Sequence, residues 1–176
     1  MGTRGLLGLI IKAQRHGFYN HFDSYPSGLG NAIVKFLQGL SNEDCAKMKN
    51  LVEEITWVNE DSLPTPELQK KYSEAGFSNL QVSNQTLEDW YCLLHKLQNG
   101  KVLLAIQNGQ VKHLTDKVDF LKDGLFCEWA YFIDFEIQKL EIWKAGEMID
   151  VATFSKVTQD GDSYMAELEK RTQEEE

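Results

Sequence analysis

The sequence predicts an α+β fold, a mostly antiparallel sheet built from N-terminal and C-terminal strands, with the central helices packed on it. Segments rich in branched and aromatic residues lie near the two ends of the chain, within residues 4–23 and 125–155. Between residues 41 and 107, apolar residues recur instead at helical spacing. The chain has 176 residues, of which 42% are apolar and 26% charged, which is typical of one globular domain.

The N-terminal strands form a predicted hairpin. Residues 4–11 are branched and apolar and predict a first strand, residues 12–15 a short loop, and residues 17–23 a second, alternating strand. One face of this hairpin is predicted to join the core, through Leu7, Leu9, Ile11, Phe18 and Phe22. The other face carries Arg4, Leu6 and Gly8 with Tyr19, His21 and Asp23. An even loop places Arg4 across from Asp23, so we expect an ion pair there.

The helices of the middle third are predicted from their ends. Residues 31–38 form a helix that ends near Gly39. Capping signatures open three more helices, and a further helical stretch covers residues 101–107. The residues of these signatures are Ser41 with Asp44, Thr65 with Pro66, and Thr86 with Asp89.

Strands return in the final third. Residues 125–134 alternate, residues 140–144 form the hairpin partner, and residues 148–155 predict a further strand. Asp162 or Ser163 is expected to cap a last helix. We therefore divide the chain into one α+β domain, residues 1–160, and a C-terminal helix with an acidic tail, residues 161–176.

Charge and cysteine content narrow the class of protein. The chain has 27 acidic and 18 basic side chains, a net charge of −9, which argues against a nucleic-acid binder because such proteins neutralise phosphates with Lys and Arg. No apolar run approaches the ~20 residues of a membrane span. Three isolated cysteines, Cys45, Cys92 and Cys127, are expected to be buried thiols. These observations predict a cytoplasmic protein that binds neither membrane nor nucleic acid.

The most unusual local sequence is the stretch from Tyr19 to Gly30. Helix N–H groups that follow Ser27 and two glycines suit an anionic group. We therefore expect a polar pocket for a small anionic ligand, or for an acidic group of a protein partner. The expected ligand-binding residues are Arg4, Tyr19, His21, Asp23, Tyr25, Ser27, Gly28, Gly30 and Glu128. The histidines lack metal-ligand spacing, so no metal and no cofactor are expected.

Other interpretations stay open. Gly28 and Gly30 also suit a purely structural turn, and a histidine next to an aspartate on a strand is often a structural hydrogen-bonded group. The alternative function is an amide or phosphoester hydrolase that uses His21 and Asp23, with Thr3 as a further candidate. The third interpretation is a structural or interaction protein without a ligand. Glu128 is included because, if its face of the strand is buried, its carboxylate needs a partner such as Arg4 or His21.

Three segments carry a resemblance. Residues 1–5 (MGTRG), 19–30 (YNHFDSYPSGLG) and 125–131 (LFCEWAY) resemble a family of small uncharacterised proteins from microbes and their viruses. Its members have an MGTR-like first strand and a YxHxDxYPxG-like second strand, which implies a shared fold and a shared polar site. The hairpin order is also vaguely similar to N-terminal-nucleophile amide hydrolases, whose mechanism uses a terminal Cys, Ser or Thr. Here Gly2 follows Met1, and Thr3 is internal.

Overall fold

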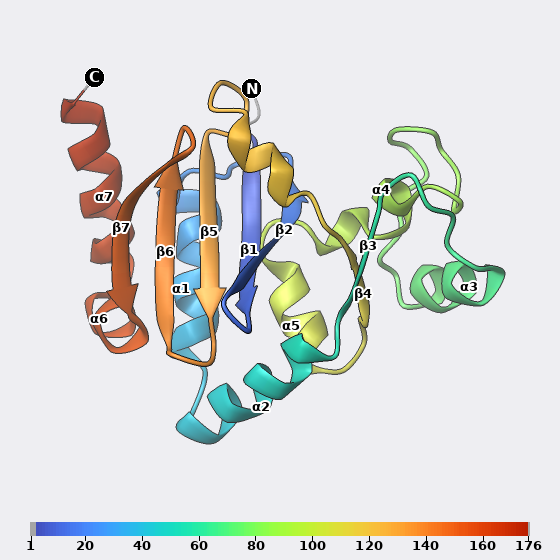
Figure 1. The fold of residues 1–176 in the computed structure, drawn as a ribbon, viewed down its shortest axis with the longest axis horizontal. Coiled ribbons are helices and arrows are strands. Elements are labelled where there is room, and N and C mark those ends of the chain that lie inside the picture. Colours follow the sequence, from blue (N-terminus) through green and yellow to red (C-terminus); the bar gives the residue numbers. More distant parts are fainter. Residues whose placement is uncertain (1–2, 176) are drawn as a thin grey trace.

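The computed structural model describes residues 3–175, and its main feature is a five-stranded sheet in the order β2-β1-β5-β6-β7 (Figure 1). The predicted N-terminal and C-terminal strands therefore share one sheet. β1 pairs in parallel with β5, and the other three pairings are antiparallel. The strands are β1 (Gly5–Ile11), β2 (Gln14–Asn20), β5 (Trp129–Asp134), β6 (Lys139–Lys144) and β7 (Glu147–Thr153). The α+β prediction is confirmed.

The β1–β2 hairpin has a tighter turn than the sequence predicted. Lys12 and Ala13 both have positive φ, 52° and 64°, as a two-residue hairpin turn requires. Leu6 consequently lies opposite Tyr19, two residues from the expected register. Because side chains alternate with a period of two, this shift leaves the expected faces unchanged. It does, however, end β2 at Asn20, so Asp23 lies beyond the strand.

A second, two-stranded sheet was not predicted from the sequence. β3 (Thr56–Val58) and β4 (His113–Thr115) pair in parallel beside β2. The His16 ring stacks on Trp57 with 4.6 Å between ring centroids, and His16 Nδ1 lies 2.8 Å from Asp116 Oδ2. These contacts connect the small sheet to the outer edge of β2.

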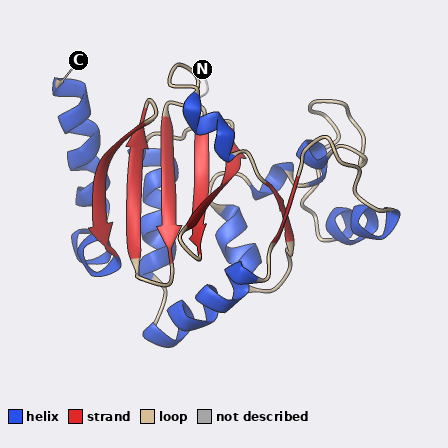
Figure 2. Ribbon diagram, viewed as in Figure 1, coloured by secondary structure: helices blue, strands red, loops and turns tan. Residues whose placement is uncertain are grey.

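Helices cover one face of the large sheet, where α1 lies behind the strands in the view of Figure 2. The main core combines this face with the helices, and a smaller apolar cluster on the other face contains Leu6, Cys127, Ala130 and Phe132. The 3₁₀ turn η3 (Val118–Lys122) packs on that smaller cluster. The helices are α1 (Asn31–Gln38), α2 (Asn42–Glu53), α3 (Pro66–Glu74), α4 (Trp90–Leu93), α5 (Lys101–Gln107), α6 (Phe154–Asp160) and α7 (Asp162–Glu174).

Several predicted helix ends are confirmed. Ser41 and Asp44 form a reciprocal capping box at α2, and the Thr65 hydroxyl accepts from the Leu68 N–H at α3. α4 differs, because Asp89 itself is its N-cap. The C-terminal helix α7 begins after Gly161 and buries Tyr164, Met165 and Leu168 in the main core.

Three expectations about the strands are wrong. Phe22 is 50% exposed, because it lies past the end of β2 and cannot join the core face. Residues 125–128 precede β5, and the chain after Thr153 turns into α6 because the Thr153 hydroxyl accepts from the Lys156 N–H as an N-cap.

The three cysteines are free and buried, as predicted. Among residues 3–175, no helix has the length and apolar character needed to cross a membrane. Met1, Gly2 and Glu176, which belong to the resemblance and to the predicted acidic tail, lie outside the described residues.

Candidate ligand site beside strand β2

Part of the Tyr19–Gly30 stretch is a buried hydrogen-bond network that fixes the end of β2. The Asn20 side chain is 1% exposed and donates to Phe22 O and to Ser24 Oγ, both at 2.8 Å. Its Oδ1 accepts from the Asn99 N–H at 2.7 Å. Tyr131 on β5 donates its hydroxyl to Ser24 O at 2.8 Å. Asn20 and Ser24 therefore shape the fold, since every polar atom here already has a partner within the protein.

The glycine turn that follows is also tightly packed. A Cβ atom on Gly28 would lie 2.2 Å from Asp23 O, so only glycine fits there. The Ser27 N–H, which we expected to meet an anionic ligand, donates to Glu169 Oε2 on α7 at 3.1 Å. At this turn the protein thus supplies its own carboxylate, and Ser27, Gly28 and Gly30 lie apart from the cleft described below.

The alternate residues of β2 and its extension face a different environment. Tyr19 Oη lies 2.8 Å from His21 Nδ1, and the Arg4 guanidinium lies beside the Tyr19 hydroxyl. Burial, and next the neighbouring Tyr91, raise the pKa of Tyr19, whereas Arg4 lowers it less. The structure therefore brings together Arg4, Tyr19 and His21, as the sequence predicted.

Aromatic residues from the α4 region complete this surface. The rings of Tyr19 and Tyr91 lie 6.1 Å apart between centroids, and Tyr91 contacts His95 at 5.1 Å. The Gln98 side chain accepts from the His21 N–H at 2.8 Å and so holds this segment against β2. Burial, and secondarily the nearby His21, lower the pKa of His95, because both disfavour its protonated form.

These residues border a polar cleft of about 460 Å³. Its lining residues come from β2 and its extension, from β4 and the residues after it, and from the segments 60–61 and 83–91. The cleft is lined by Tyr19, His21, Glu60, Asp61, Ser83, Asn84, Asp89, Tyr91, Thr115 and Lys117. Three carboxylates thus face a single lysine, and Lys117 Nζ already pairs with Glu60 at 2.6 Å.

Asp89 organises one wall of the cleft. Its carboxylate accepts from the Ser83 hydroxyl at 2.7 Å and from the Tyr91 N–H at 2.9 Å. Burial by itself would raise the pKa of Asp89, but these hydrogen bonds outweigh burial and hold it below its usual value. Asp89 is therefore a fixed negative charge, whereas the exposed Asp61 carboxylate has no partner among the described residues and is free to meet a ligand.

Several predicted site residues lie elsewhere. Asp23 has φ of 56°, is exposed, and accepts from the Tyr25 hydroxyl at 3.1 Å. The ion pair expected between Arg4 and Asp23 is not formed, since the Arg4 guanidinium lies 4.6 Å from the Phe126 ring centroid. The Glu128 side chain is exposed, and only its N–H contacts the N-terminal strand, through Arg4 O at 3.0 Å. The condition of a buried Glu128 is not met, because β5 starts at Trp129, four residues after the predicted start, and Glu128 lies outside the strand.

The hydrolase alternative combined His21 with Asp23, but Asp23 does not line the cleft and its carboxylate accepts from the Tyr25 hydroxyl. Ser24 is buried and donates to Asn20 O, and Ser27 lies at the turn beside α7. Neither serine lines the cleft with His21. Among residues 3–175, no group of three or more His, Cys, Asp or Glu side chains is arranged to hold a metal ion.

The sequence did not reveal the acidic wall of the cleft. The sequence identifies Asp89 only as part of a capping signature and gives no sign that Tyr91 lines a cleft. Glu60 and Asp61 follow β3, a strand of three residues that leaves almost no periodic signal. The positive φ of Ser83 and Gln85, 50° and 55°, shows a tightly constrained loop but is invisible in the sequence. Comparison with known proteins adds nothing further: no protein family, no curated protein and no solved structure matches the chain.

Proposed function

We propose that this chain is a ligand-binding domain and that its cleft beside β2 takes a small cationic ligand. The observation that carries the proposal is the composition of the cleft. Two tyrosine rings lie 6.1 Å apart beside three carboxylates, and the single lysine is already paired.

The electrostatics favour a positive ligand. Glu60 and Lys117 compensate each other, so Asp61 and Asp89 leave the cleft negative. An ammonium group in the cleft that reaches the ring face of Tyr19 or Tyr91 gains attraction from that ring in addition to these carboxylates. Such contacts contribute about 0.5–2 kcal/mol each, depending on how far they are desolvated. The ligand class is therefore an amine or quaternary ammonium compound small enough for about 460 Å³.

The anionic ligand expected from the sequence would depend on Arg4 and His21. Arg4 does not line the cleft, and an anion there would face Asp61 and Asp89 at close range. Like charges in one cleft repel, so we expect an anion to bind less well than a cation of the same size. The hydrolase alternative has no residue arrangement that favours it over binding.

Calorimetric titration with choline, its uncharged isostere 3,3-dimethyl-1-butanol and inorganic phosphate tests the charge preference. We expect choline to bind and the isostere and phosphate to bind at least about ten-fold more weakly, which corresponds to ~1.4 kcal/mol. Binding of phosphate in preference to choline would support the anionic ligand instead. No binding of choline up to ~10 mM, or equal binding of the isostere, would overturn the proposal.

Variants locate the binding within the cleft. Asp61→Asn should weaken choline binding about three- to ten-fold without changing the melting temperature, because the Asp61 side chain is exposed and unpaired. Tyr91→Phe keeps an aromatic face and should retain most of the affinity, whereas Tyr91→Leu should lose it. Asp162→Asn on α7, outside the cleft, is the matched control for a lost surface carboxylate. An equal effect of Asp61→Asn and Asp162→Asn would exclude this cleft.

A further inference from the structure

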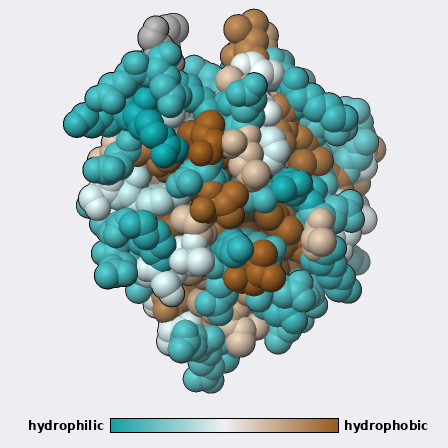
Figure 3. Space-filling view, turned by 60° about the vertical axis from the view of Figure 1, so that its left-hand side comes forward, coloured by the Kyte–Doolittle hydropathy of each residue, from teal (hydrophilic) through white to brown (hydrophobic). Residues whose placement is uncertain are grey.

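The outer edge of the large sheet is formed by β7, which pairs with β6 on one side and with no other described strand on the opposite side. Its sequence, EMIDVAT, contains neither proline nor lysine, the residues with which proteins commonly protect such edges. Met148 is 48% exposed and Val151 is 44% exposed. Figure 3 turns this side of the molecule toward the viewer and shows hydrophobic surface among hydrophilic side chains. The Arg171 guanidinium of α7 donates to Ile149 O at 3.4 Å, and no described strand covers the rest of this edge.

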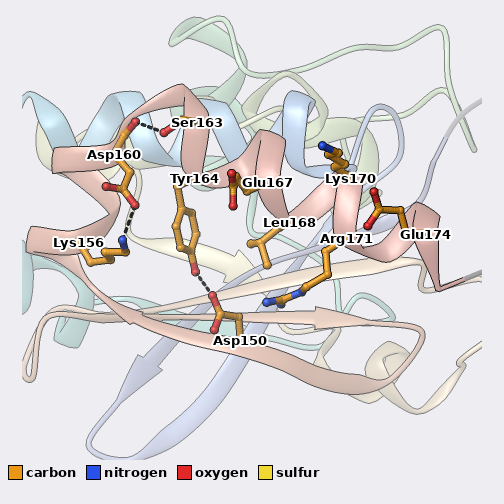
Figure 4. Close-up of a pocket in the computed structure, with 10 residues that line it drawn as sticks. All are labelled: Asp150, Lys156, Asp160, Ser163, Tyr164, Glu167, Leu168, Lys170, Arg171 and Glu174. Carbon is orange, nitrogen blue, oxygen red and sulfur yellow. Dashed lines mark hydrogen bonds and ion pairs between the residues drawn. The ribbon is translucent and has the colours of Figure 1, made fainter.

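A groove of about 620 Å³ lies behind this edge, between β7 and the helices α6 and α7 (Figure 4). Inside it, the Tyr164 hydroxyl donates to Asp150 Oδ2 at 2.5 Å, and burial together with Asp150 raises the pKa of Tyr164 well above its usual value. The outer groups of the groove are charged and exposed. Lys156 and Asp160 form an ion pair at 2.8 Å on α6, and Arg171 and Glu174 lie near the end of α7.

We propose that β7 pairs in antiparallel orientation with β7 of a second copy of this chain, so that two five-stranded sheets become one continuous sheet. This inference is independent of the proposed ligand. Two-fold symmetric association is the commonest form of oligomer, and it presents each surface to itself. The pairing would satisfy the outward-facing backbone groups around Val151 and shield the Val151 side chain from water.

The geometry of β7 indicates where the two-fold axis lies. The register against β6 shifts between Ile142 and Trp143, so one extra residue of β7 interrupts regular pairing near Ile149. Residues 150–153 form the regular part. An axis through Val151 places Val151 opposite itself and Asp150 opposite Ala152 of the second copy. No two carboxylates then face each other directly across the pair, which removes the main electrostatic obstacle.

The charges of the helices are complementary under the same symmetry. The axis brings α6 of one copy toward the C-terminal end of α7 of the other. Lys156 then approaches Glu174 of the second copy, and Asp160 approaches Arg171 of the second copy. Because the interface is symmetric, each attraction occurs twice. This charge pattern favours a second copy over an unrelated partner.

Sedimentation velocity over a range of ~5–300 μM tests the pairing. We expect reversible dimers, and we expect Val151→Lys to abolish them because it buries an amine at the symmetry axis. Leu63→Lys alters another exposed apolar side chain, 73% exposed and remote from β7, and should leave the dimer intact. A wild-type chain that stays monomeric throughout this range, or a Val151→Lys chain that dimerises as the wild type does, would overturn the proposal.

Two further variants test the register and the charges. Val151→Cys places two thiols across the axis, at a Cα separation suited to a disulfide, and should give a covalent dimer on mild oxidation. The three native cysteines are buried and serve as the internal control. Lys156→Glu should weaken the dimer, and adding Glu174→Lys should restore it. A double variant no stronger than Lys156→Glu, or a Val151→Cys chain that fails to cross-link, would contradict the arrangement.

Discussion

Replacing Asn20 with alanine tests whether the Tyr19–Gly30 stretch is mainly a structural element. The substitution removes three hydrogen bonds of 2.7–2.8 Å. It also leaves the Asn99 N–H and the Phe22 carbonyl without their side-chain partner. Each lost bond contributes about 1 kcal/mol, and a stranded buried group costs about as much or more. We therefore expect Asn20→Ala to lower the free energy of unfolding by about 3 kcal/mol, which for a chain of this size lowers Tm by roughly 6–12 °C.

Thermal and urea unfolding followed by circular dichroism measure this change. Asn50→Ala is the matched control, because Asn50 is an exposed residue in the last turn of α2. Its stability should change by less than about 0.5 kcal/mol. His21→Ala, which removes one partly exposed contact with Tyr19, should lower Tm by only about 2–4 °C. If Asn20→Ala melted within ~2 °C of the wild type, the buried network would not be what fixes the end of β2.

Three more outcomes follow from the packing and the charges. Gly5→Ala should yield little folded protein by circular dichroism, because its Cβ would lie 2.1 Å from the Trp129 carbonyl oxygen of the neighbouring strand. Gly39→Ala is the control and should fold normally, because an added Cβ there would lie 3.5 Å from the nearest atom. Burial raises the pKa of Cys127 to about 12, so at pH 8 only about one Cys127 thiol in ten thousand is ionised. Mass spectrometry should therefore find Cys127 unlabelled by iodoacetamide until the protein unfolds. Burial would raise the pKa of Glu141, but the hydrogen bonds from Arg15 outweigh burial and lower it. The Arg15–Glu141 pair therefore stabilises the folded state fully above the pKa of Glu141 in the unfolded chain, ~4.3. This stabilisation is lost as the pH falls through the lower pKa of the folded state. The Tm difference between wild type and Glu141→Gln should accordingly be small, as for an exposed pair, and should vanish in acid.

The parts of the fold that the sequence predicted are those with strong local signals. The α2 capping box and the Thr65-Pro66 start of α3 are set by short-range hydrogen bonds and were placed correctly. β3 and β4 were missed because strands of three residues show no periodicity, and their pairing depends on contacts such as His16 with Asp116, a hundred residues apart. Helix α6 was missed because the sequence continues β7 without a break before Thr153 caps it.

The site was predicted only in part for a similar reason. Strand alternation was enough to place Tyr19 and His21 on the face of Arg4. Alternation could not show that the two-residue turn shifts the register so that β2 ends before Asp23. It also could not show that the Glu169 carboxylate of the last helix accepts the hydrogen bond of the Ser27 N–H. The carboxylates of the cleft come from loops on other elements, and only the tertiary arrangement brings Asp61 and Asp89 to Tyr19.

The parallel pairing of β1 with β5 has a consequence for synthesis on the ribosome. Gly5 pairs with Trp129, so 124 residues must be added after Gly5 before its partner exists. At ~5–20 residues per second this takes about 6–25 s. During that interval the β1–β2 hairpin can form, but Leu7 and Leu9 stay without the strand that later lies beside them. We therefore expect the nascent chain to engage chaperones that bind exposed apolar hairpins, and to release them only after Asp134 has left the ribosome.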